Sequence, residues 1–410
     1  MTERINGSSS KRNMVLSFIA LAALLVLVYV LDIVIKPTSS WNNLMTCLEK
    51  GTIYALVAVS MNLLNGFTGL FSLGQAGFML IGAYAYAVFA IAPEDRATVY
   101  QYYEGGGLIH LSLPHMLQDM MGGADAFGGA IGYYLGIILL MIFAGLLTAG
   151  IAFLIGIPVL RLKSDYLAIA TLGFAEIIRS FFQWEGLGPV TNGSNVLRKF
   201  ASYDSSIFPV LVAGVCIAFI VMLINSSYGR AFKSIRDDEI AAEAMGVNLF
   251  KHKELSFVIS SFFAGVGGAL LAMFQNNINA SPFTSNMTYE ILLIVVIGGI
   301  GSVTGSIIGS YLFIACSEWW LRGLDKGEFL GIEADFMTPG FRKVVFAVVI
   351  MGIVLFYSRG IMGTKEFSWD GLFNFFRTLP ARIAGIPGKI KAKFSAKKHE
   401  KNTKKVKEAQ

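Results

Sequence analysis

Amides, hydroxyls and glycines interrupt two apolar stretches of the chain in a pattern suited to binding a polar solute. Residues 62–86 have the sequence NLLNGFTGLFSLGQAGFMLIGAYAY, and residues 297–311 have the sequence IGGIGSVTGSIIGSY. Glycine inside a helix costs roughly 1 kcal/mol relative to alanine, so this glycine density predicts broken helices. Inside a membrane, the N–H and C=O groups freed by a break must face protein or a water-filled cavity.

We therefore expect these stretches to contribute to a substrate pathway. Amide side chains within apolar segments need polar partners, which favours a cavity lining for the amides of the first stretch. Gly301, Gly305 and Gly309 are spaced by four, and for them close helix packing is the favoured interpretation. The candidate pathway residues are Asn62, Asn65, Gly69, Gly74, Gln75, Gly77, Glu176, Gly299 and Ser302.

Glu176 is an acid within an apolar segment, and Arg179 follows it three residues later. Helical spacing places both side chains on one face. They form either an ion pair near the membrane interface or a polar wall of the pathway, and the sequence favours neither.

Residues 229–253 predict a short helix outside the membrane. Asp237 or Asp238 is suited to cap it, and Gly246 is a stop signal. Apolar residues follow at helical spacing, at Ile240, Ala244 and Val247. Because acids and bases are balanced here, we expect the helix to enter a groove of a protein partner rather than lie on lipid.

The whole composition is that of a membrane protein. Hydrophobic residues make up 55% of the 410 residues, charged residues only 15%, and mean hydropathy is +0.62. Soluble domains carry about 25% charged residues, so a cytosolic enzyme and a disordered chain are excluded. Three cysteines and four histidines share no ligand spacing, so we expect no disulfide framework and no metal site.

We predict an all-α polytopic fold with about ten spans, some of them short and broken. A span needs ~20 apolar residues. Lys and Arg near the span ends place both termini in the cytoplasm, with one exception: Arg198 and Lys199 must then lie outside. The expected segments are 14–35, 51–64, 72–92, 131–157, 166–182, 208–224, 255–275, 289–321 (counted twice) and 344–357.

The predicted organisation is a cytoplasmic N-terminus (1–13), a transmembrane permease domain (14–358) and a basic cytoplasmic tail (359–410). Residues 371–410 hold eleven Lys and Arg against two Glu, a charge suited to anionic lipid rather than nucleic acid. The outer segment 93–129 is either a loose loop or a docking face.

Five motifs together resemble one known family, the permease subunits of branched-chain amino acid ABC importers, of the LivM type. They are NLLNGFTGLFSLGQAGFMLIGAYAYA, LKSDYLAIATLGFAEIIR, GPVTNGSN, GRAFKSIRDDEIAAEAMGVN and IVVIGGIGSVTGSIIGSYL. The resemblance implies a prokaryotic inner-membrane importer. Its other subunits would be a sister LivH-like permease, two cytoplasmic ATP-binding subunits and an extracytoplasmic substrate-binding protein.

The resemblance also implies that the short helix is the coupling helix that docks on the ATPase. Ala241, Ala242 and Gly246 fit the importer pattern Glu-Ala-Ala-x-x-x-Gly, whereas Ile240 occupies the Glu position. The expected coupling residues are Arg236, Asp237, Asp238, Glu239, Ala242 and Gly246.

No P-loop or hydrolase motif occurs in the sequence, so the chain is expected to be no enzyme and to bind no cofactor, with ATP used by partner subunits. Leu, Ile and Val are the expected substrates, delivered near residues 191–195. Urea, amides or other amino acids remain open as substrates, and a stand-alone ion-coupled transporter is the rival class.

Overall fold

The computed structural model describes residues 42–103, 107–123, 126–162 and 164–320, with short pieces at 26, 28–30, 328–329, 332–333, 348, 351–352, 360–363 and 366. All of these belong to one compact unit, Leu24–Glu366. The expected first and last spans, the N-terminus 1–13 and the tail 359–410 lie outside the described residues apart from isolated positions. Those assignments stay predictions.

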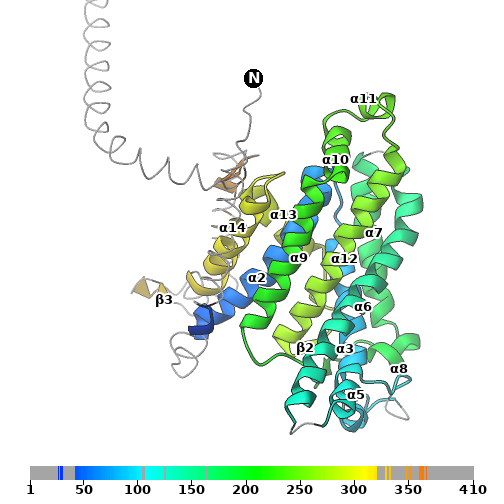
Figure 1. The fold of residues 1–410 in the computed structure, drawn as a ribbon, viewed down its shortest axis with the longest axis vertical. Helices are drawn as coiled ribbons and strands as arrows, with labels where there is room; N and C mark the ends of the chain where they lie inside the picture. Colours follow the sequence, from blue (N-terminus) through cyan, green and yellow to red (C-terminus); the bar gives the residue numbers. More distant parts are fainter. Residues whose placement is uncertain are drawn as a thin grey trace, which may run out of the picture. The chain divides into compact units, whose positions relative to one another are not determined.

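The described chain is mostly helical, and its long helices run side by side as a bundle (Figure 1). Each matches one of the expected segments. Their bounds are α2 (Asn42–Asn62), α3 (Gln75–Ala90), α6 (Phe127–Val159), α7 (Ser164–Gln183), α9 (Ile207–Asn225), α12 (Leu249–Gln275), α13 (Ser285–Gly298) and α14 (Val303–Ile314).

Four segments among the described residues are long and apolar enough to cross a membrane: Asn43–Phe67, Phe127–Val159, Ile207–Asn225 and Leu249–Gln275. Three shorter apolar helices cover Gln75–Ala90, Ser285–Gly298 and Val303–Glu318. α7 is in neither group, because acidic and basic residues lower its hydropathy. The short helices flank the two glycine-rich stretches, as expected for broken spans.

The core of the bundle is the contact between α3 and α12. Nearly every residue of α3 is buried, as expected for a helix that is apolar all round. A Cβ atom at Gly82 would run into the backbone of Gly265, and one at Gly268 into the backbone of Met79. Glycine is required at both positions, since it lets the two backbones touch.

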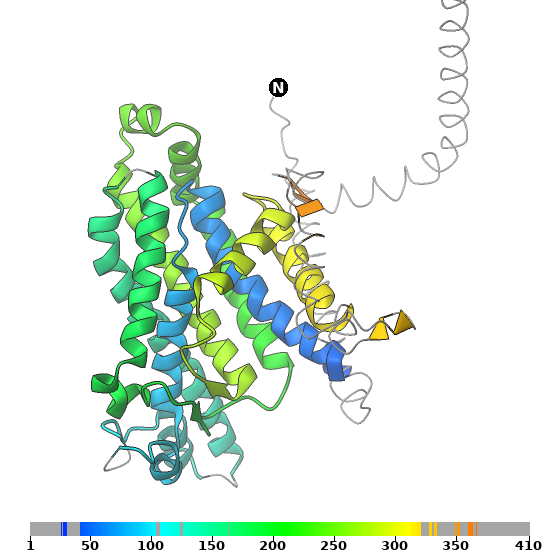
Figure 2. The same ribbon diagram turned by 180° about the vertical axis from the view of Figure 1, so that it is seen from behind.

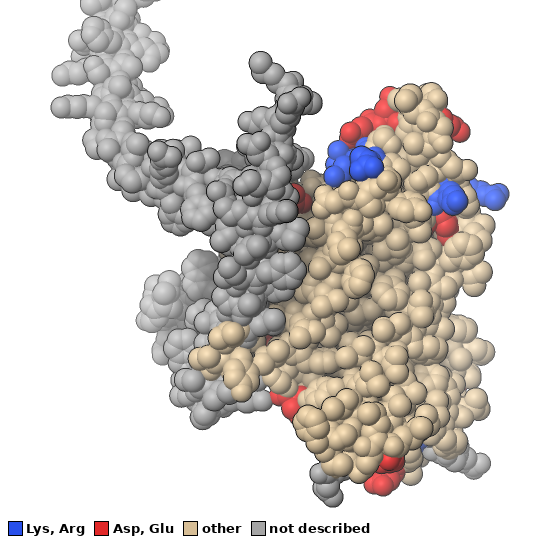
Figure 3. Space-filling model, in the orientation of Figure 1, with Lys and Arg blue, Asp and Glu red and all other residues tan. Residues whose placement is uncertain are grey.

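Charged side chains gather towards the two ends of the bundle, with an uncharged surface between them (Figure 3). One end, the α11 end, carries α10 (Ser227–Asp237) and α11 (Glu239–Ala244). The opposite end, the α5 end, holds short elements: η3 (Pro93–Asp95), α4 (Arg96–Val99), α5 (Leu113–Met120), η5 (Glu185–Leu187), α8 (Gly188–Thr191), β1 (Leu197–Arg198) and β2 (Asn277–Ile278).

The described part of segment 93–129 is not a loose loop. α5 packs on the first turns of α6, where Gly132 and Gly136 leave room for the backbone of Leu117 and Pro114. Arg96 is 2% exposed and donates from Nη2 to the Leu111 carbonyl at 2.9 Å. These contacts hold the α5 end as an ordered layer, leaving its use as a docking face untested.

α2 and α14 lie against each other along the bundle (Figure 2). Thr52 and Tyr311 share a hydrogen bond of 2.7 Å between their hydroxyls, and Gly51 leaves space for the tyrosine ring. The π-helix η6 (Ala315–Trp320) extends α14. The strands β3 (Glu328–Phe329) and β4 (Ile332–Glu333) form a small antiparallel pair. The packing of α14 on α2 brings the two glycine-rich stretches together.

Candidate functional site

The first break lies between α2 and α3. α2 continues into one π-helical turn, η2 (Leu63–Phe67), and residues 68–74 are irregular until α3 begins. Threonines of other helices accept hydrogen bonds from the freed backbone. The Leu73 N–H donates to Thr171 of α7 at 3.0 Å, and the Ala76 N–H to Thr288 of α13 at 3.1 Å. At these two positions the backbone is satisfied by protein, as a membrane interior requires.

Part of the first break is open and incompletely bonded. Gly69 is exposed and has a φ of +78°, and Phe71 is 42% exposed. Asn65 accepts a bond of 3.2 Å from the Ser72 N–H through Oδ1. Its Nδ2 is buried and has no hydrogen-bond partner. The first break therefore offers an unused donor.

The second break, residues 299–302, is short, and all of its residues are buried except Ile300, which is 49% exposed. Gly299 and Gly301 have φ angles of +123° and +84°, and a Cβ atom at Gly299 would meet the Gly363 carbonyl. The start of α14 is capped twice: Ser302 Oγ accepts from the Gly305 N–H at 3.1 Å, and Glu366 Oε1 accepts from the Val303 N–H at 2.7 Å. Every one of these contacts holds the second break in place.

Asn62 joins the two breaks. Its Oδ1 accepts from the Gly301 N–H at 2.8 Å, and its Nδ2 donates to the Ser302 carbonyl at 2.9 Å and to Ser306 Oγ at 2.8 Å. The side chain is fully buried, with both amide hydrogens in use. In this structure Asn62 and Ser302 are therefore bonded to protein, and their expected pathway role stays a prediction.

The other candidates at the start of α3 also pack. A Cβ atom at Gly74 would lie 3.1 Å from the Thr171 carbonyl oxygen, and one at Gly77 would lie 2.8 Å from Ala175 Cα. Gln75 is 2% exposed and donates to Ser60 Oγ at 2.8 Å. Gly74 and Gly77 bring α3 close to α7, and Gln75 bonds it to α2. Nothing in these contacts tests a pathway role.

The glycine ridge of the second stretch is confirmed only in part. Gly305 and Gly309 pack closely on Gly298 and Ile294 of α13, as expected for a small-residue ridge. Gly301 was assigned to the same ridge, and that was wrong. α14 begins only at Val303, so Gly301 lies in the break.

Glu176 is the candidate that borders a hollow. Its Oε2 accepts from Arg179 Nε at 2.7 Å, and its Oε1 accepts from the Ser285 N–H at the start of α13 at 3.2 Å. The two side chains are 33% and 26% exposed. Glu176 adjoins a hollow of about 470 Å³, which is lined by Glu176, Ile177, Ser180, Phe181 and Trp184. Ionised groups facing lipid are costly, so this face of α7 needs water or protein beside it.

At the α11 end, the short helix forms as predicted. Asp238 is its cap, accepting bonds from the Ile240 and Ala241 N–H groups at 2.9 and 3.0 Å. Gly246, with a φ of +85°, follows it as the stop. Glu239 is held by Lys253 of α12 at 2.7 Å.

The outer face of α11 is apolar and uncovered within the described chain. Ile240 is 82% exposed, and the neighbouring Met245 is 85% exposed, whereas Ala242 is buried against the bundle. The expected apolar positions Ala244 and Val247 are exposed and partly exposed. An uncovered apolar stripe on a capped helix fits a groove in a partner.

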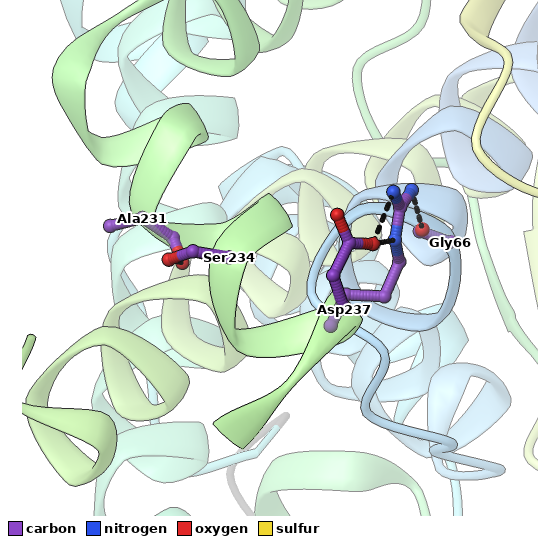
Figure 4. A network of polar contacts seen from close by, with 5 residues as sticks. Gly66, Ala231, Ser234 and Asp237 are labelled. Carbon is purple, nitrogen blue, oxygen red and sulfur yellow. Dashed lines mark hydrogen bonds and ion pairs between the residues drawn. The ribbon is translucent and has the colours of Figure 1, made fainter. Parts of the chain in front are cut away.

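Arg236 and Asp237 do not belong to this short helix, contrary to the grouping by sequence, but are the last two residues of the preceding helix α10. Arg236 Nη1 donates to the Gly66 carbonyl at 3.2 Å, and its Nε and Nη2 donate to Asp237 Oδ1 at 3.0 and 2.8 Å. Dashed lines in Figure 4 mark these bonds to Gly66 and Asp237. Lys233 of α10 also lies 5.6 Å from the Phe67 ring centre. Through α10, the short helix is therefore bonded to the first break.

Sequence reasoning missed several of these contacts. Glu366, Thr171 and Thr288 hold the breaks from more than 60 residues away, and their residue types carry no local signal. Within the described residues, no group of His, Cys, Asp or Glu could hold a metal ion.

Membrane-length apolar helices, two glycine-rich breaks and a polar helix face define a multi-pass membrane protein of the transport-permease class. The chain belongs to the family described as branched-chain amino acid transport system / permease component, which it matches over residues 43–357. The resemblance found in the sequence is thereby confirmed.

The chain is similar to several curated permeases. It is 30% identical over 300 residues to the high-affinity branched-chain amino acid transport system permease protein LivM of Salmonella typhimurium, an alignment covering 65% of this chain and 61% of that protein. It is 24% identical over 275 residues to the probable LivM permease of Methanocaldococcus jannaschii, covering 64% of this chain and 76% of the relative.

The high-affinity LivH permease of Salmonella typhimurium is 23% identical over 330 residues, covering 77% of this chain and 93% of that protein. The chain spans about three fifths of the length of the LivM proteins of Salmonella typhimurium and Escherichia coli, 61% in each case. No solved structure matches the chain.

Proposed function

We propose that this chain is the membrane-spanning permease subunit of an ATP-driven importer for the branched-chain amino acids Leu, Ile and Val. It lies in the prokaryotic inner membrane with about ten spans and both termini in the cytoplasm. It forms the pathway with a sister LivH-like permease and binds no cofactor of its own. Family membership and the names of the relatives support this assignment.

The observation that carries the mechanism is the hydrogen bond between Arg236 and Gly66. Two ATP-binding subunits bind on the cytoplasmic side, at the apolar face of α11. A single residue, Asp238, separates α11 from α10, so a displacement of α11 moves Arg236. Because Arg236 is bonded to η2, that motion reaches the first break directly. ATP hydrolysis in the partner is coupled to access through this chain of contacts.

The pathway runs along the polar face of α7 and the open part of the first break. A zwitterionic substrate needs polar partners, because an unpaired charge costs several kcal/mol in an apolar medium. The unused Nδ2 donor of Asn65 is suited to a carboxylate, and Glu176 with Arg179 supplies both signs of charge. The sister permease covers this face of α7.

Reconstitution tests the proposal. The chain is placed in liposomes with its sister permease, the ATPase subunits and the binding protein, and leucine uptake is measured. We expect uptake that requires ATP and stops when any one component is omitted. Uptake by the chain alone, driven by an ion gradient, would instead support the stand-alone transporter.

The docking of the ATPase is tested separately with a matched pair of substitutions. Met245→Asp places a charge beside α11 on a methionine that is 85% exposed, and Met120→Asp places one at the α5 end on a methionine that is 74% exposed. Co-purification of the ATPase subunits should be lost with Met245→Asp and retained with Met120→Asp. Equal co-purification of both variants would exclude α11 as the docking element.

A further inference from the structure

A polar hollow of about 380 Å³ lies at the α5 end, away from the two breaks. α4 and the residues after it line one wall, and the segment from α8 to β1 lines the other. Of its lining residues, the argument uses Val99, Asn192, Asn195, Val196, Arg198 and Lys199. It also contains the two basic residues that are exceptions to the charge rule for outer loops.

Asn192 brings an unused acceptor to this hollow. The residue is 1% exposed, and its Nδ2 donates to the carbonyl oxygens of Val99 and Val196 at 3.1 and 3.3 Å. Its Oδ1 is buried and accepts no hydrogen bond. A buried amide oxygen without a donor is destabilising by about 1–3 kcal/mol, so a ligand with N–H groups gains by filling the site.

Arg198 brings an unpaired cation. Its backbone is fixed by the register of β1 with β2, where Arg198 lies opposite Asn277. The side chain is exposed and forms no ion pair with the acids that the structure describes. Its neighbour Lys199 is already bonded to Asp95 at 2.8 Å. Arg198 is therefore the cation available for an anionic group.

The two walls are held together without a ligand. Tyr100 donates from its hydroxyl to the Val190 carbonyl at 2.8 Å, and the Leu108 N–H donates to the Pro189 carbonyl at 2.9 Å. Burial raises the pKa of Tyr100 to about 12, so the hydroxyl keeps its proton at physiological pH. A site that is preorganised in this way loses little conformational entropy on binding.

We infer that this hollow is a receiving site for a free α-amino acid with a branched apolar side chain, on the outward face of the permease. Arg198 binds the carboxylate, Asn192 Oδ1 accepts from the ammonium group, and Val99 and Val196 contact the side chain. The inference rests on the proposed function, because the orientation of the α5 end follows from it. A ligand that offered only a carboxylate would bind Arg198 but would give Asn192 Oδ1 no hydrogen-bond donor.

Binding of leucine to the purified full-length chain in lipid nanodiscs tests the inference, with calorimetry or saturation-transfer NMR as the readout. Leucinamide lacks the carboxylate, and 4-methylpentanoate lacks the ammonium group. We expect both analogues to bind the wild type more weakly than leucine. Arg198→Gln should weaken leucine binding about tenfold or more while leaving leucinamide binding unchanged.

Two further variants complete the design. Asn195→Trp fills the hollow from an exposed position and should abolish binding. Arg230→Gln removes an exposed arginine at the α11 end and should leave binding unchanged. Leucine binding that is equal in the wild type and Arg198→Gln would overturn the inference.

Loss of binding-protein association in Arg198→Gln, with leucine binding intact, would assign the hollow to the partner instead and also overturn the inference. Failure of the proposed function is a separate result, since it appears as absent ATP-driven uptake by the wild-type assembly.

Discussion

The two breaks differ in how completely their polar groups are used. In the second break, four residues connect two helices, side chains cap the start of α14, and Ile300 is the one exposed residue of the four. In the first, seven irregular residues connect η2 to α3, Gly69 and Phe71 are exposed, and the Nδ2 donor of Asn65 is unused. The first break alone receives a hydrogen bond from α10, through Arg236.

This difference indicates a division of roles. The second break resists change, because displacing it would leave the buried Gly301 N–H and the Val303 N–H unpaired. The first break has an unused donor and an exposed glycine, so it loses fewer contacts when it is displaced. We infer that the second break is the anchor and the first the moving element. Four comparisons test this, beginning with the largest expected effect.

The bond from Arg236 to the first break gives the largest expected effect. Arg236→Ala removes a charge-assisted hydrogen bond, which is worth about 1.5–3 kcal/mol. Uptake per ATP hydrolysed should fall at least about tenfold in reconstituted liposomes. Arg230→Ala in the same helix removes an exposed arginine bonded only to Ser227, and should leave that ratio unchanged. If uptake per ATP hydrolysed were equal in the two variants, the bond from α10 to the first break would play no part in coupling.

The two asparagines compare the breaks directly. Asn62→Ala removes three hydrogen bonds and leaves the Gly301 N–H unpaired in the core, a loss of about 3 kcal/mol in the free energy of unfolding. Asn65→Ala removes a single bond to the Ser72 N–H and should lower it by about 1 kcal/mol. Thermal unfolding in detergent measures both. A larger loss for Asn65→Ala would reverse the proposed roles.

The glycines with positive φ give the third comparison. Alanine at Gly299 combines backbone strain with a collision against the Gly363 carbonyl, whereas alanine at Gly69 adds strain and a contact of 3.0 Å with Arg236 Cγ. We expect Gly299→Ala to lower the midpoint of thermal unfolding more than Gly69→Ala, whose cost is about 1–2 kcal/mol. Gly69→Ala should instead reduce the rate of uptake. Equal stability of the two variants would contradict the tight packing of the second break.

The smallest effect is expected at the cap of α14. Glu366→Gln keeps the size of the side chain but weakens its bonds to the Val303 and Thr304 N–H groups, at a cost of about 1 kcal/mol. Uptake should be nearly unchanged, since the second break keeps its hydrogen bonds to Asn62. Loss of uptake at full stability would indicate that the second break moves as well.

Hydrophobic patterning predicts the helices well in their interiors and poorly at their ends. α12 was expected from residue 255 but begins at Leu249, because Asn248 caps a first turn that carries charged side chains. α2 likewise begins at Asn42 rather than at residue 51. Hydropathy ends a span at charged residues, whereas hydrogen bonding continues the helix through them.

The candidate site was predictable where its signals are local. The cap at Asp238 and the stop at Gly246 follow from short-range backbone rules, and both are present. The bond between Arg236 and Gly66 joins residues 170 positions apart, and no local sequence pattern predicts it. The same is true of Glu366 and the threonines, whose partners depend on how the helices pack.

The backbone contact between α3 and α12 has a consequence for alternating access. Glycine-to-carbonyl contacts at Gly82 and Gly268 leave no clearance for sliding or rotation of one helix past the other. We therefore expect α3 and α12 to move together as one rigid pair. Under the proposed function, we infer that opening on either side of the membrane is a tilt of the neighbouring helices about this pair. Alanine at Gly82 would push α3 and α12 apart.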